Sequence, residues 1–157
     1  MTKKQVTRFV KKISGGVNIP VRYVNDCGKD FKGCSAVACF NSDGIEILIN
    51  KKDFKNLTDN FWKCILLHEV GHFNSVDFLD KLGVGHSVVM NELFAQLWAI
   101  KRADKLGMER LKRESISILK RWKRMNWNST DRRYRLASNF FLDPKNKEVI
   151  DLLLNNK

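Results

Sequence analysis

The 157-residue chain has no apolar run long enough to form a membrane-spanning helix. Its first residues, Met1–Gln5, also lack the apolar segment of a secretory signal peptide. We therefore expect a cytoplasmic protein with no membrane span. Internal repeats, low-complexity tracts and linkers are absent as well, and the length is typical of one domain. We expect residues 1–157 to fold as a single unit.

Cysteine is scarce, and its spacing fits neither a disulfide scaffold nor a C-x-x-C metal site. We expect all four thiols to be reduced. Cys64 follows Phe61-Trp62 in an apolar stretch, where a free thiol behaves as a small buried hydrophobe. The other three are Cys27, Cys34 and Cys39.

Acidic residues are outnumbered, with 17 Asp and Glu against 29 Lys and Arg and a formal net charge of +12. The segment Lys101 to Arg135 alone has thirteen basic and four acidic residues, a net charge of +9. Such a surface attracts nucleic acid or an anionic membrane. No zinc-finger spacing or stacked-aromatic motif accompanies it, so we favour a solvated helical surface and keep nucleic-acid contact as the alternative.

Hydrophobic periodicity in the first 50 residues predicts a helix and a small sheet. Val6, Phe9, Val10 and Ile13 recur at helical spacing until Gly15-Gly16, and basic residues occupy the remaining face. We expect this helix to cover one face of a sheet rather than lie on a membrane. The expected strands cover residues 21–24, 35–40 and 45–50, and the last two are joined by a hairpin turn at residues 41–44.

The rest of the chain reads as mainly helical. A helix capped by Thr58 is expected, then an irregular stretch from Asn74 to Ser87, then helices over residues 88–106 and 108–125. Two more are expected, one starting at residues 129–131 and one running from Pro144 to Leu154. The sequence thus predicts an α+β domain with a small antiparallel or mixed sheet of about three strands and a helical C-terminal half.

The segment His68-Glu69-Val70-Gly71-His72 reads as the H-E-x-x-H core of a zinc-dependent hydrolase. Histidines four residues apart share one helix face, so both rings can reach one metal ion. Glu69 points beside that ion, where its carboxylate can take a proton from a metal-bound water. We predict His68 and His72 as ligands and Glu69 as the general base.

A catalytic zinc needs a third protein ligand, and the candidates are Glu92 and His86. Glu92 begins a helical pattern whose short side chains Ala95 and Ala99 lie near its own face. These residues would let that helix approach Gly71 on the motif helix. We favour Glu92, and His86 remains the alternative.

With H-E-x-x-H followed about twenty residues later by Glu92 on a second helix, the chain resembles the gluzincin zinc metallopeptidases. Its order of elements is similar to the compact zincin-like domain of the ImmA/IrrE type, which occurs in phage and mobile elements. The resemblance implies a domain in which residues 1–75 hold the helix, sheet and motif helix, and residues 76–157 hold the Glu helix and the basic helices. It also implies that His68, His72 and Glu92 bind Zn²⁺, that Glu69 is the base, and that strand 45–50 is the sheet edge for peptide substrate.

Two positions depart from the gluzincin pattern. Gln96 stands where an aspartate supports a ligand histidine, and its amide oxygen could accept the ring N–H instead. No downstream histidine is available to polarise the substrate carbonyl, and Tyr134 or Tyr23 could substitute for it. His86 would instead fit the SprT-like proteases, which take a third histidine and act on proteins crosslinked to DNA.

These patterns predict a zinc metallopeptidase, specifically a metalloendopeptidase, that cleaves protein or peptide substrates in the cytoplasm. The resemblance to the ImmA/IrrE type implies that it is phage-encoded. The alternative functions are a SprT-like DNA-associated protease, with His86 as the ligand, and a basic nucleic-acid or virion-associated binding protein with a non-catalytic zinc site.

Overall fold

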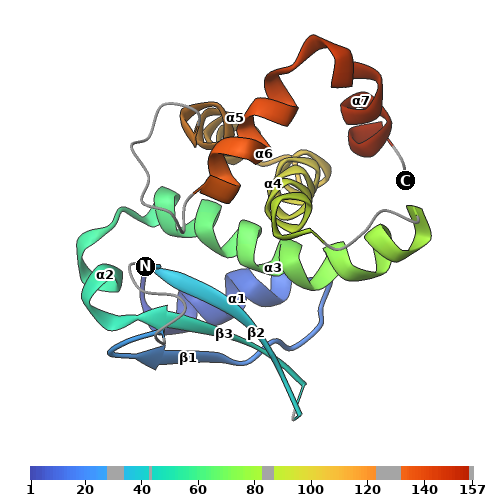
Figure 1. Cartoon of the computed structure of the whole chain (residues 1–157). Coiled ribbons are helices and arrows are strands. Elements are labelled where there is room, and N and C mark those ends of the chain that lie inside the picture. Colours follow the sequence, from blue (N-terminus) through green and yellow to red (C-terminus); the bar gives the residue numbers. More distant parts are fainter. Residues whose placement is uncertain (28–33, 43, 83–86, 123–131, 156–157) are drawn as a thin grey trace.

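The computed structural model describes residues 1–27, 34–42, 44–82, 87–122 and 132–155 (Figure 1). It is an α+β structure with one small sheet and a helical C-terminal half, as predicted. Helix α3 (Asp59–Leu82) runs between the sheet and the C-terminal helices (Figure 1). The sheet therefore lies on one side of α3, which β2 contacts, and α4 and α5 contact α3 from the other.

The sheet has three strands in the order β1-β3-β2. They are β1 (Val21–Val24), β2 (Ala36–Asn41) and β3 (Gly44–Asn50); β1 pairs with β3 in parallel and β2 pairs with β3 antiparallel. The predicted hairpin is confirmed, and Gly44 takes φ of 119° at its end, a conformation open to glycine. The expectation that β3 is the edge was wrong, because β1 pairs with its other side. The outer strand of the hairpin is β2.

Helix α1 (Lys3–Ile13) begins at a capping box in which the Gln5 amide donates to Thr2 Oγ1 and Thr2 donates back to Gln5 Oε1. Three of its apolar side chains are fully buried in the main core, together with Ile47 and Ile49 of β3 and Trp62 of α3, and Phe9 is partly buried against that core. The predicted role of this helix, covering one face of the sheet, is confirmed. The members from α1 are Val6, Val10 and Ile13.

Helix α3 is longer than expected. Thr58 accepts a hydrogen bond from the Phe61 amide at its start, as predicted, but the helix continues through Asn74 to Leu82. The predicted irregular stretch was wrong for residues 75–82, because neither glycine nor proline interrupts them and the helix can continue. Its remaining part, residues 83–86, lies outside the described residues. A short helix, α2 (Lys51–Asn56), was not predicted; the side chain of Asn50 caps it.

The C-terminal half is built around α4 (Val88–Lys105), which is capped by Ser87 and followed by Gly107 with φ of 65°. Around it pack α5 (Glu109–Trp122), α6 (Arg132–Leu142), the 3-10 helix η3 (Pro144–Asn146) and α7 (Lys147–Asn155). They share a second core that includes Leu93, Leu97 and Leu119. The predicted cap at residues 129–131 and the end of the third helix beyond Trp122 lie outside the described residues.

None of the helices, as far as the structure describes them, is long and apolar enough to cross a membrane. All four cysteines are reduced, as predicted, and Cys64 is buried in the main core.

Candidate metal centre

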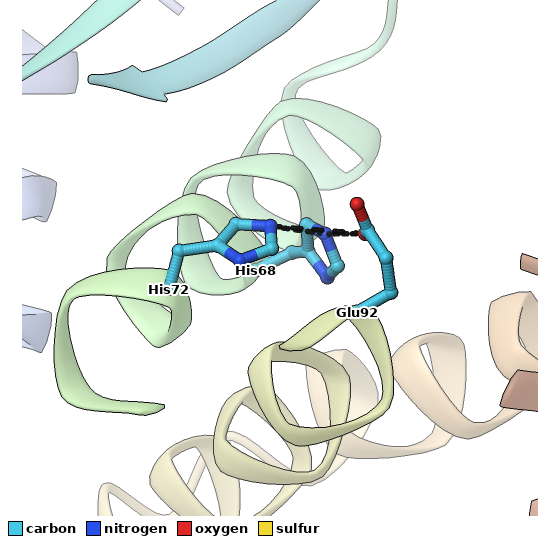
Figure 2. Close-up of side chains that lie close together, drawn as sticks. All are labelled: His68, His72 and Glu92. Carbon is cyan, nitrogen blue, oxygen red and sulfur yellow. Dashed lines mark hydrogen bonds and ion pairs between the residues drawn. The ribbon is translucent and has the colours of Figure 1, made fainter. Parts of the chain in front are cut away.

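Three predicted ligands meet between α3 and α4 (Figure 2). His68 Nε2 lies 3.1 Å from Glu92 Oε2 and 3.1 Å from His72 Nε2. His72 Nε2 lies 3.7 Å from the same carboxylate oxygen. Two nitrogens and one oxygen therefore point at a common centre, and the sequence prediction that these three side chains converge is confirmed.

The two helices approach closely because Gly71 has no side chain. A Cβ built at Gly71 would lie 2.4 Å from the carbonyl oxygen of Ala95 and 2.8 Å from its Cα. Ala95 and Ala99 on α4 are both fully buried. The small residues predicted to allow the contact do so, and they set the spacing between the His-bearing helix and Glu92.

A chain of hydrogen bonds fixes the orientation of His68. Gln96 Nε2 donates to the Ser115 carbonyl oxygen at 2.8 Å, so its Oε1 is the atom that faces His68 Nδ1 at 3.0 Å. Because an amide oxygen can only accept, Nδ1 of His68 must carry the proton. The lone pair of the neutral ring is then on Nε2, the atom that faces Glu92. The predicted role of Gln96 as acceptor for a ligand histidine is thus supported by geometry.

The site favours a positive charge at its centre. Burial alone would lower the pKa of His68, but the neighbouring carboxylate of Glu92 outweighs it and raises this pKa. Burial likewise works to raise the pKa of Glu92, yet His68, His72 and Arg133 together lower it. Burial and the adjacent His68 lower the pKa of His72 to about 4. Glu92 is thus ionised and His72 is neutral near pH 7, the forms that bind metal.

The donor spacing fits a metal ion. Two ligand atoms about 2.1 Å from a tetrahedral zinc lie roughly 3.4 Å apart. The three distances of 3.1, 3.1 and 3.7 Å bracket that value. Acceptor atoms brought this close in a buried place repel one another unless a proton or a metal ion lies between them. His68, His72 and Glu92 could therefore hold a metal ion.

Glu69 lies beside this group and faces the outer strand of the hairpin. Its Oε2 accepts a hydrogen bond of 2.7 Å from the Ala38 amide of β2. Burial raises the pKa of Glu69 to about 7, against the opposing effect of His68. A carboxyl group that titrates near neutral pH can both take and return a proton.

A cavity of about 220 Å³ opens onto these groups. Its walls come from the segment before β2, from β2, and from α3, α4 and α6. They are formed by Cys34, Ala36, Val37, Ala38, Phe40, Glu69, His72, Val88, Asn91, Glu92, Arg133 and Tyr134. A substrate in this cavity would contact the candidate base and two of the candidate ligands.

The two tyrosines offered as carbonyl-polarising groups lie in different places. Tyr134 lines the cavity, and burial raises the pKa of its hydroxyl, so the group stays protonated. Tyr23 instead packs edge-on against Phe54 in the main core, with ring centroids 5.0 Å apart. His86, the alternative third ligand, lies outside the described residues.

Sequence reasoning missed Arg133, whose Nε lies 3.2 Å from Glu92 Oε1. Arg133 belongs to α6, some forty residues after Glu92 in the sequence. The two residues come together only when the chain folds. Nothing in the local sequence distinguishes Arg133 from Arg132 and Arg135.

Several cations of the segment Lys101 to Arg135 are engaged within the protein. Arg102 donates to the Ile13 carbonyl oxygen at 2.6 Å, and Lys112 donates to Asp104 at 2.7 Å. Arg121 and Arg133 pair with glutamates. Part of the basic character of this segment therefore stabilises the fold.

Comparison with protein-family models, with curated proteins and with solved structures gives no match to this chain.

Proposed function

We propose that this protein is a zinc-dependent metallopeptidase. The observation that carries the proposal is the convergence of His68, His72 and Glu92 beside a cavity that Glu69, His72 and Glu92 line. Two imidazoles and one carboxylate form the donor set of catalytic zinc sites that keep a position open for water. A purely structural zinc site is normally closed by four protein ligands.

Zinc bound there would lower the pKa of a coordinated water and polarise a substrate carbonyl. The protein's own residues would do the rest. Glu69, with its pKa near 7, would accept the proton of the attacking water and pass it to the leaving nitrogen. Tyr134 would donate its hydroxyl hydrogen toward the carbonyl oxygen, since that hydroxyl stays protonated.

The walls of the cavity suit an extended peptide. Residues of β2, the outer strand of the hairpin, form one side, and Val88 and Asn91 at the start of α4 form another. Phe40 and Val88 are more than half exposed at 58% and 56%, so they offer apolar surface to a substrate side chain. This arrangement favours a peptide over a small polar metabolite.

The test compares zinc content and hydrolysis of a proteome-derived peptide mixture for the wild type and variants. Glu69→Gln should keep its zinc and lose about 10²–10⁴-fold in rate. His68→Ala should lose both the metal and the activity. An active Glu69→Gln variant would eliminate the mechanism, and a zinc-loaded wild type that cleaves nothing would favour the alternative of a non-catalytic zinc protein.

The SprT-like alternative predicts a different ligand. If His86 is the third ligand, His86→Ala loses zinc and Glu92→Ala keeps it. The proposed site predicts the reverse, and elemental analysis of the two variants decides between them.

A further inference from the structure

The two oxygens of Glu92 face different partners. Oε2 lies 3.1 Å from His68 Nε2, whereas Oε1 lies 3.2 Å from Arg133 Nε. Glu92 is only 5% exposed, so bulk water does not compete for either oxygen. One oxygen of the Glu92 carboxylate therefore faces the candidate metal centre, and the other faces α6.

Arg133 is itself held in place by aromatic side chains. Its guanidinium carbon lies 4.9 Å from the centre of the Tyr134 ring, and its Nη2 donates to the Tyr134 hydroxyl at 3.2 Å. The Tyr134 ring in turn lies 4.8 Å from that of Trp122 on α5. The contact with Glu92 is an ion pair and not a hydrogen bond, because Arg133 Nε has no aligned acceptor.

The binding mode of the carboxylate matters for a catalytic metal. A carboxylate that binds through both oxygens takes two coordination positions, whereas one that binds through a single oxygen takes one. With two histidines and one oxygen, a tetrahedral zinc keeps its fourth position for water. A positive charge beside the second oxygen favours the one-oxygen mode, since it makes that oxygen a poorer donor.

We propose that Arg133 is a positioning residue that restricts Glu92 to one-oxygen coordination and so keeps a coordination position open at the metal. This inference rests on the metal site of the proposed function. Helix α6 carries none of the ligands, but its packing on α4 brings Arg133 to Glu92 and so completes the site.

The test uses Co²⁺ added to the metal-free full-length protein, because the visible absorption of Co²⁺ is stronger in four-coordinate than in five-coordinate sites. Wild type should give the intense four-coordinate spectrum. Arg133→Gln removes the charge and should give a weaker spectrum of the five-coordinate type, because the second oxygen of Glu92 can then also coordinate the metal. Arg133→Lys keeps a charge and should restore much of the wild-type spectrum.

The matched control is Arg135→Ala, an exposed arginine two residues further on the same helix, which should leave the spectrum unchanged. Thermal unfolding of each variant separates a loss of fold from a change in coordination. If wild type binds Co²⁺ and Arg133→Gln gives the same spectrum, this inference is overturned while the metal site stands. If wild type binds no Co²⁺ or Zn²⁺, both fail.

Discussion

Replacing Gly71 with alanine tests whether helix contact sets the geometry of the metal centre. The new Cβ would lie 2.4 Å from the Ala95 carbonyl oxygen, roughly 1 Å closer than van der Waals contact allows. The obstacle is backbone, so no side chain can rotate away, and one helix must move. Overpacking of this kind costs about 3 kcal/mol, the upper part of its usual range.

Alanine also favours a helix over glycine by about 1 kcal/mol. The net loss of unfolding free energy is therefore about 2 kcal/mol, which for a chain of this size lowers Tm by roughly 4–8 °C. Zinc affinity should fall too, because displacement of α4 separates Glu92 from the histidines. The assay is thermal unfolding with and without zinc, with the exposed Asn74→Ala on the next turn of α3 as control. A Gly71→Ala protein that melts at or above the wild-type temperature would refute the close-contact argument.

Three further predictions follow from other parts of the molecule. Arg102→Ala should lower the free energy of unfolding, measured in urea, by about 1.5–3 kcal/mol, because the guanidinium donates to the carbonyl oxygens of Ile13 and Lys12 at the end of α1. Arg102→Lys should recover part of this stability, and an unchanged midpoint of urea unfolding in Arg102→Ala would contradict the role. Burial raises the pKa of Tyr23 to about 12 from its ordinary 10, so the folded state favours the neutral phenol. Its contribution to the free energy of unfolding is complete below pH 10 and is lost as the pH rises to 12, so Tyr23→Phe should lose less stability than the wild type between pH 10 and 12. If the basic surface binds DNA, affinity should fall steeply with salt, and negligible binding at low salt would leave it as solvated surface.

Much of the fold could be predicted because its signals are local. The amphipathic pattern of α1, the turn before Gly44 and the cap at Thr58 each depend on a few adjacent residues. The strand order could not, since β1 pairs with β3 across more than twenty residues and no local signal specifies that pairing. The sequence prediction ended α3 at Asn74, because Gly83 and Gly85 indicate an irregular segment. Residues 75–82 can continue the helix, and α3 reaches Leu82.

In the candidate site, too, the residues that could be predicted are those placed by local sequence. His68, Glu69 and His72 were predictable because one helix turn carries them, and Glu92 and Gln96 because a second turn does. Arg133 was not, because it reaches Glu92 only through the packing of α6 on α4. Ala38 also escaped prediction, because its bond to Glu69 depends on how β2 lies against α3.

The most direct test of the account is zinc stoichiometry by elemental analysis, measured on the full-length wild type and on His68→Ala, His72→Ala, Glu92→Ala and His86→Ala. We predict one zinc ion per chain in the wild type and in His86→Ala, and none in the other three variants. A wild-type protein that takes up no zinc, or a Glu92→Ala variant that keeps it, would contradict the account.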